Sequence, residues 1–264
     1  MEEGRRNLCR PAKIRRWRPL TNDFCGSHPL HSAQHTGRTR FLQYFHLSWP
    51  ILELRPAKPI TPPLPGTSTH KATLRKILAG IRFALPASYR ADASQRIVGR
   101  MLGIPELRAA PAVHCYWPVV DFGEVDTRPL IEAVVVGGNR VFLPVISSYE
   151  RRPGVVPRIH EAEYNATTSL KKNRWGIGEP VDSDSRAFGC EVAVVPGLGA
   201  GRNGIRVGHG WGFYDELLGD SRVPVLFPCY DACVVDFIEG WPTDVRVSQI
   251  ITESQIIAIE GVFL

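Results

Sequence analysis

The chain has 264 residues, with 44% hydrophobic and 22% charged residues, which are ordinary proportions for a globular protein. No apolar stretch approaches the roughly 18 residues of a membrane-spanning helix, which argues against a membrane protein. The net charge of +6 arises from residues 1–70, which contain 11 Lys/Arg and 4 Asp/Glu, a net of +7; the rest therefore carries 6 − 7 = −1. This nearly neutral remainder argues against general nucleic-acid binding.

Residues 1–69 form a basic extension with nine prolines and no sustained helical or alternating pattern. Burial in such a segment cannot offset its ordering entropy, so we predict a disordered extension. One alternative is a wrongly assigned start, with the true start near residue 70. The others are an organelle-targeting peptide and a basic arm for nucleic acid. Glu2 and Glu3 argue against targeting, because targeting peptides are poor in acidic residues.

Residues 70–264 are predicted to fold as one domain. Apolar residues at helical spacing predict helices over 71–85 and about 88–102. The apolar run 112–117 predicts a buried strand, which includes Cys115 as a core thiol. Thr127 is a candidate N-cap for a helix over 130–136, and 140–146 predicts the next strand. A strand, a helix and a strand of these lengths indicate a parallel pair.

The second half contains shorter apolar runs separated by glycine and proline. Residues 147–189 are predicted to be mostly loop. Further elements are predicted as a strand over 191–195, a glycine-rich loop over 197–212, a helix beginning in 211–218, and short strands over 224–227 and 248–252. The alternation predicts a three-layer α/β fold, in which helices flank a mainly parallel sheet and the glycine-rich loop lies at its carboxyl edge.

The glycine-rich loop is the sharpest functional signal, with seven glycines in residues 195–215. Glycine lets backbone N–H groups approach a ligand closely, and the start of the next helix adds positive potential for a phosphate. Arg206 can donate two hydrogen bonds to an anion, and Asp215 can hold Mg²⁺. A glycine-rich surface turn without a ligand is the alternative.

Five motifs in order resemble the 5-formyltetrahydrofolate cyclo-ligase family, over about residues 70–253. The loop, as Pro196-Gly-Leu…Gly204-x-Arg206-x-Gly208-x-Gly210-x-Gly212-Phe-Tyr-Asp215, resembles the family's C-terminal signature, which usually ends in Tyr-Tyr-Asp. The other four motifs are Lys71-Ala-Thr-Leu-Arg75, Glu124-Val-Asp-Thr-Arg-Pro-Leu-Ile131, Gly176-Ile-Gly-Glu-Pro180, and the closing pair Asp244-Val-Arg-Val247 and Ile250-Ile-Thr-Glu253. The resemblance implies a cytoplasmic enzyme that uses ATP and Mg²⁺ to convert 5-formyltetrahydrofolate into 5,10-methenyltetrahydrofolate, with release of ADP and phosphate. We expect small-molecule ligands and a monomer.

The resemblance also implies roles for individual residues. Arg206 and Tyr214 would be catalytic, and Asp215 and Asp244 would hold Mg²⁺. Trp117, Glu124 and the loop residues 209–213 would bind the folate. ATP would contact Lys71, Arg75, Arg206, Val207, Gly208, His209, Gly210, Trp211, Gly212, Phe213 and Tyr214.

Three departures from the family pattern leave the exact activity open. Ala200-Gly201 replaces the usual F-D, Trp211 stands where many members have lysine or glycine, and Ser248 replaces an aspartate. A paralogue that binds nucleotide or folate without closing the ring is therefore the alternative function.

Overall fold

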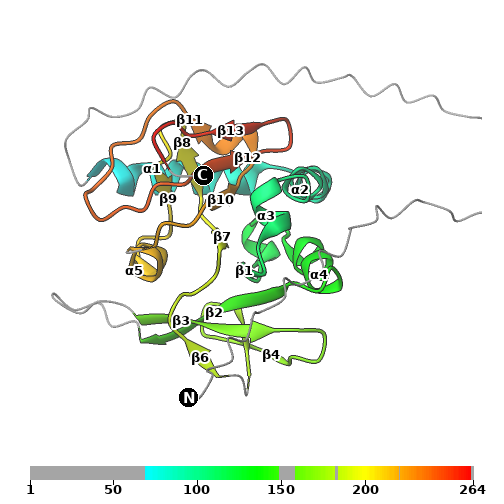
Figure 1. Cartoon of the computed structure of the whole chain (residues 1–264). Coiled ribbons are helices and arrows are strands. Elements are labelled where there is room, and N and C mark those ends of the chain that lie inside the picture. The colour runs from blue at the N-terminus through cyan, green and yellow to red at the C-terminus, as the bar shows by residue number, and fades with distance from the viewer. Residues whose placement is uncertain (1–68, 149–157, 182–183, 220, 263–264) are drawn as a thin grey trace, which may run out of the picture. The chain divides into compact units, whose positions relative to one another are not determined.

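The computed structural model describes residues 69–148, 158–181, 184–219 and 221–262, all within one compact unit. The predictions for the extension fall outside these residues. Eight strands form the central sheet (Figure 1). From edge to edge, these are β13 (Ile256–Ala258), β12 (Gln249–Ile251), β10 (Val225–Pro228), β7 (Val192–Val194), β1 (Ala112–His114), β2 (Arg140–Ser148), β3 (Arg158–Tyr164) and β6 (Ser185–Arg186).

The five strands from β12 to β2 are parallel, and antiparallel strands close both edges. Every residue of β12, β10, β7 and β1 is buried. Burial of both faces explains why these strands are mainly apolar rather than alternating, with His114 and Gln249 as the polar residues among them. β1 and β2 pair in parallel and are joined through α4, as the sequence predicted.

Helices cover both faces of this sheet. Figure 1 shows α2, α3 and α4 on one side and α5 on the other, which confirms the layered α/β fold. The helices are α1 (Thr69–Ala84), α2 (Ala87–Met101), α3 (Pro105–Ala109), α4 (Arg128–Val136) and α5 (Phe213–Leu218), with 3₁₀ turns η1 (Val120–Phe122) and η2 (Asp231–Cys233). None of the helices in the described ranges is both long and apolar enough to cross a membrane.

Two small sheets complete the described fold. β8 (Gly199–Gly201) pairs with β9 (Arg206–Val207) and with β11 (Val234–Val235). β4 (Leu170–Lys172) and β5 (Gly178–Pro180) form an antiparallel pair, called the β4–β5 hairpin below. The prediction of a continuous loop over 197–212 is therefore wrong, because β8 and β9 lie within it.

The prediction that residues 147–189 are mostly loop is also wrong. β3, β4, β5 and β6 lie there. β3 was missed because its sequence, Arg-Ile-His-Glu-Ala-Glu-Tyr, is polar, and it buries Glu161 beside Ala162. Its pairing along β2 gives the backbone hydrogen bonds that the local sequence does not signal.

Two local details differ from the sequence predictions. Thr127 occupies the N-cap position of α4, but its hydroxyl donates to the carbonyl of Tyr116 at 2.8 Å instead of capping the helix. The carboxylate of Asp126 accepts the Arg128 N–H at 3.1 Å. α5 begins at Phe213 rather than Trp211, because Gly212 has φ of 76°, outside the helical region.

Candidate active site

A cavity of about 1020 Å³ lies at the carboxyl ends of the parallel strands, where the sequence placed the ligand site. This volume is at the upper end of ligand pockets, which are about 300–1,000 Å³. Tyr116 and Trp117 line it just after β1, and Pro196 and Leu198 just after β7. Helix α1, residues 206–215 and the β4–β5 hairpin complete its walls. All the predicted site residues line this one cavity.

Helix α1 brings Lys71 and Arg75 to the cavity, as their spacing of four residues predicts. Lys71 is buried and forms an ion pair with Asp244. Arg75 Nε donates to the carbonyl of Gly208 at 3.0 Å. The helix therefore holds one cation against the glycine-rich loop at Gly208 and another against Asp244.

Two glycines of the loop have positive φ, and one of them lies against the Arg75 side chain of α1. Gly210 has φ of 89°, and a Cβ there would lie 3.0 Å from Cζ of Arg75. Gly212 also has positive φ, 76°, but a Cβ there would meet no atom within 4 Å. Glycine is thus required at 210 by both its backbone and its contact, and at 212 by the backbone alone.

Arg206, Tyr214 and Asp215 form one contact group. Arg206 is buried, donates from Nη2 to Oδ1 of Asp215 at 2.8 Å, and lies with Cζ 5.6 Å from the ring centre of Tyr214. Its Nε has no hydrogen-bond partner. Burial raises the pKa of Tyr214 well above its usual value, so the phenol is protonated at neutral pH and is not a base.

The two predicted metal ligands lie next to each other. Oδ1 of Asp215 accepts the N–H of Val245 at 3.3 Å, one residue after Asp244. Asp244 in turn accepts from Lys71 and from the N–H of Trp241. Mg²⁺ commonly takes one or two protein carboxylates and completes its shell with water and phosphate oxygens. Two carboxylates that line one cavity, linked through the Val245 backbone, fit that donor set.

Trp117 and Glu124 lie at another part of the cavity wall. A Cβ at Gly178 would lie 2.9 Å from Cδ1 of Trp117, so the β4–β5 hairpin packs directly on this indole. Oε2 of Glu124 accepts the N–H of Val119 at 2.8 Å. Burial raises the pKa of Glu124, although the Val119 bond and the charge of Arg82 oppose the shift.

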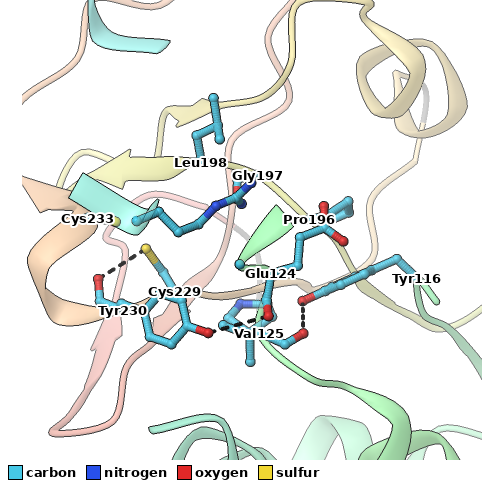
Figure 2. A pocket seen from close by; sticks show the side chains of 12 residues that line it. Tyr116, Glu124, Val125, Pro196, Gly197, Leu198, Cys229, Tyr230 and Cys233 are labelled. Atoms are coloured by element: carbon cyan, nitrogen blue, oxygen red, sulfur yellow. Dashed lines mark hydrogen bonds between the residues drawn. The ribbon is translucent and has the colours of Figure 1, made fainter. Parts of the chain in front are cut away.

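A second, small cavity of about 10 Å³ adjoins Glu124, with space for roughly one water molecule. Figure 2 shows Tyr116 and Tyr230 directed toward the Glu124–Val125 backbone. Tyr116 donates to the carbonyl of Val125 at 3.0 Å, and Tyr230 to that of Glu124 at 3.4 Å. These buried hydroxyls fix the turn that carries Glu124.

Three aromatic side chains form a cluster at the loop that was not predicted from the sequence. Trp211 stacks on Phe213 with ring centres 6.1 Å apart, and Trp175 from the β4–β5 hairpin meets both rings edge-on at 5.7 and 6.0 Å. All three line the cavity. Trp175 immediately precedes the Gly176–Pro180 motif, and this proximity was the available signal.

His209 is exposed where the loop borders the cavity. Desolvation by its neighbours lowers its pKa, and the charges of Arg82 and Arg75 lower it further. A neutral imidazole beside two arginines leaves the arginines as the charged groups of this wall.

A buried polar network behind the cavity was also missed. Nδ1 of His114 lies 2.9 Å from Oε1 of Glu161, which also accepts from Sγ of Cys190 at 3.2 Å. His114 and Glu161 are fully buried, and the His114 ring meets Tyr214 edge-on at 5.8 Å. The network therefore contacts Tyr214 through the His114 ring.

The model of the 5-formyltetrahydrofolate cyclo-ligase family matches residues 67–253. The chain belongs to this family. It is 26% identical over 174 residues to 5-formyltetrahydrofolate cyclo-ligase from Haemophilus influenzae, covering 65% of this chain and 89% of that protein. A probable cyclo-ligase from Schizosaccharomyces pombe is 31% identical over 157 residues, covering 57% and 72%. The NMR structure of Aquifex aeolicus 5,10-methenyltetrahydrofolate synthetase superimposes with a TM-score of 0.61 at 25% identity, covering 72% of this chain and 93% of that one.

The three departures from the cyclo-ligase pattern have different surroundings. Ala200 and Gly201 are buried in β8, and a Cβ at Gly201 would lie 2.8 Å from the backbone nitrogen of Ile238. Ser248 is fully buried, and its hydroxyl accepts the N–H of Val225 at 3.1 Å. Of the three, Trp211 is the departure that lines the cavity.

Proposed function

We propose that the protein is an ATP- and Mg²⁺-dependent 5-formyltetrahydrofolate cyclo-ligase that forms 5,10-methenyltetrahydrofolate, ADP and phosphate. The observation that carries the proposal is that one cavity joins a cationic, glycine-rich wall to a second wall with a buried carboxylate and an indole. ATP and a reduced folate must meet in one site for this reaction. The cavity volume of about 1020 Å³ suits two ligands together.

The cationic wall would hold the triphosphate. Lys71 and Arg75 offer charge from α1, and the backbone of residues 207–213 offers N–H donors. Arg206 and Tyr214 lie beside this loop, where Arg206 can stabilise the charge of the transferring phosphoryl group. Asp215 and Asp244 would hold Mg²⁺, which when bound neutralises phosphate charge.

The other wall would hold the folate. Trp117 offers a flat apolar surface for the pterin, and the carboxylate of Glu124 accepts hydrogen bonds from its N–H groups. Residues 209–213 contact both ligands in this arrangement. The formyl oxygen attacks the γ-phosphorus and ADP leaves. The N10 amine then attacks the activated carbon and loses its proton, and phosphate departs. The protein's contribution is mainly positioning and charge stabilisation.

The proposal is tested by mixing the purified full chain with Mg²⁺, ATP and 5-formyltetrahydrofolate. Near-ultraviolet absorbance from methenyltetrahydrofolate is expected, in equal amount to the ADP released. Absence of both products would overturn it. Trp211 favours one second candidate, a paralogue that binds these ligands without ring closure; calorimetric binding of both ligands with no turnover would select it. A cytoplasmic location and a monomeric state remain predictions, checked by fractionation and light scattering.

A further inference from the structure

Arg82 is a buried cation in helix α1 to which the sequence analysis gave no role. Arg82 is 3% exposed, and it lines both the main cavity and the small one. Nη1 donates to the carbonyl of Gly197 at 3.1 Å, and Nε is buried without a hydrogen-bond partner. A guanidinium has five N–H donors, so this environment leaves most of its capacity unused.

Arg82 also has no carboxylate at ion-pair distance within the described part of the chain. Glu124 is near enough for the charge of Arg82 to oppose the rise of its pKa, but its carboxylate is hydrogen-bonded to the Val119 N–H. The charges of Arg82 and Arg75 both lower the pKa of His209, so these two cations lie near the same part of the cavity wall. A buried guanidinium that forms no ion pair and leaves Nε unpartnered is costly, and an anionic ligand in the cavity would offset that cost.

The position of Arg82 on α1 indicates where that ligand charge lies. Lys71, Arg75 and Arg82 share one face of the helix, and at 1.5 Å per residue Arg82 is about 10 Å along the axis from Arg75. Arg82 adjoins Glu124 in the lining of the small cavity, whereas Lys71 and Arg75 contact Asp244 and Gly208. Arg82 thus lies between the wall assigned to the triphosphate and the wall assigned to the folate.

We propose that Arg82 is an anion-binding residue of the main cavity, which donates to an oxyanion of the bound ligand. Identifying this oxyanion with the γ-phosphoryl group of ATP, at the point of transfer to the folate, rests on the proposed cyclo-ligase function. The proposal that Arg82 binds an anion does not depend on that function. The other source of the same chemistry is a carboxylate of the folate.

The test measures binding to the full chain by calorimetry, so it does not depend on turnover. The ligands are Mg²⁺ with a non-hydrolysable ATP analogue, Mg²⁺ with ADP, and 5-formyltetrahydrofolate. Arg82→Gln is expected to weaken binding of the ATP analogue by about tenfold or more, because a charge-assisted hydrogen bond is lost. Binding of ADP should change by less than about threefold. A comparable loss confined to 5-formyltetrahydrofolate would support the anion site with the folate carboxylate as its ligand. Equal affinities of variant and wild type for all three ligands would overturn the proposal.

Thermal unfolding without ligand separates this role from a structural one. If Arg82 served only to hold Gly197, Arg82→Gln would lower the unfolding temperature and leave ligand-induced shifts unchanged, which contradicts the proposal. If Arg82 binds an anion of the ligand, Arg82→Gln should leave the unfolding temperature without ligand nearly unchanged and reduce the shift that the ligand produces. Exposed Lys76 in the same helix is the control, and Lys76→Gln should match wild type in every measurement. If Arg82→Gln does not fold, Arg82→Lys replaces it in the test. A single ammonium group cannot keep the hydrogen bond to Gly197 and also make the guanidinium's two-point contact with an oxyanion. Undiminished binding of all three ligands by Arg82→Lys would overturn the proposal.

Discussion

Nη2 of Arg206 donates to Oδ1 of Asp215 at 2.8 Å, so a proposed phosphoryl-binding cation and a proposed Mg²⁺ ligand are paired before any ligand enters. The pair spans β9 and α5 and fixes both ends of the loop that carries Gly208, Gly210 and Gly212. In the proposed complex, phosphate oxygens of ATP would supply the negative charge for Arg206, and Mg²⁺ would supply the positive charge for Asp215. Under the proposed function, Arg206 and Asp215 would exchange their mutual contact for contacts with the metal–nucleotide complex.

Asp215→Asn tests the metal role of this pair. The amide keeps the shape but offers a neutral oxygen, so Mg²⁺-dependent turnover should fall about 100-fold or more. Arg206 also loses its counter-charge, and because the Asp215 side chain is 28% exposed, we expect a moderate stability loss of about 1–2 kcal/mol. Turnover is followed by absorbance and stability by urea unfolding. Asp92→Asn, at an exposed ion pair in α2, should change neither.

Trp211→Gly tests the departure that faces the cavity. Glycine removes the ring stacked on Phe213 and leaves Trp175 without this neighbour. We expect a higher KM for one of the two substrates with kcat less affected, because a stacking ring contributes about 0.5–1.5 kcal/mol to binding. Trp211→Phe should retain most of the affinity. If Trp211 instead blocks catalysis, as in a binding-only paralogue, glycine would raise turnover from a negligible level.

The main layers of this fold followed from local patterns, and the missing parts depend on contacts distant in sequence. α1, α2 and α4 have a helical periodicity and the buried parallel strands are short, mainly apolar runs, and local sequence reveals both patterns. β3 does not, because the partners of its buried Glu161, which are His114, Cys190, the Gly189 N–H and Arg186, come from other segments. Similarly, nothing in the local sequence distinguishes Arg82 from the other arginines, and only the structure shows that it is buried without an ion-pair partner in the described residues. The glycine-rich motif located the cavity, but not the Trp175 side chain that completes it.

Glu161→Gln tests the buried network through acid stability. Burial would raise the pKa of Glu161, but the bonds from His114, Cys190 and Gly189 outweigh it and lower the pKa below 4.5. The carboxylate's contribution is therefore complete above pH 4.5 and is lost as the pH falls below that value. Glu161→Gln should cost about 1–3 kcal/mol at pH 7 and make stability less dependent on pH below 4.5. Glu163→Gln, at an exposed pair on the same strand, should cost less than about 1 kcal/mol.

Glu124→Gln tests the folate wall. Burial raises the pKa of Glu124, so its carboxylate takes up a proton at a higher pH than usual. If the ionised form accepts hydrogen bonds from the pterin, wild-type affinity should decline as the pH falls through this raised pKa. The variant should bind folate about tenfold more weakly at neutral pH and show a flatter profile, measured by calorimetry. Exposed Glu132→Gln is the control. A variant that retains full affinity at every pH would remove Glu124 from the folate site.

Gly210→Ala and Gly212→Ala form a matched pair for the loop. Both glycines have positive φ, 89° and 76°, so alanine should destabilise the protein by about 1–2 kcal/mol at either position. The new methyl group at 210 would lie 3.0 Å from Cζ of Arg75, whereas that at 212 would meet no atom within 4 Å. Displacing Arg75 releases its bond to the carbonyl of Gly208 and disturbs the proposed triphosphate cradle. Gly210→Ala should therefore lose at least about tenfold more ATP affinity than Gly212→Ala, at similar stability. Equal losses of affinity would mean that the backbone conformation of the loop, and not its contact with α1, determines nucleotide binding.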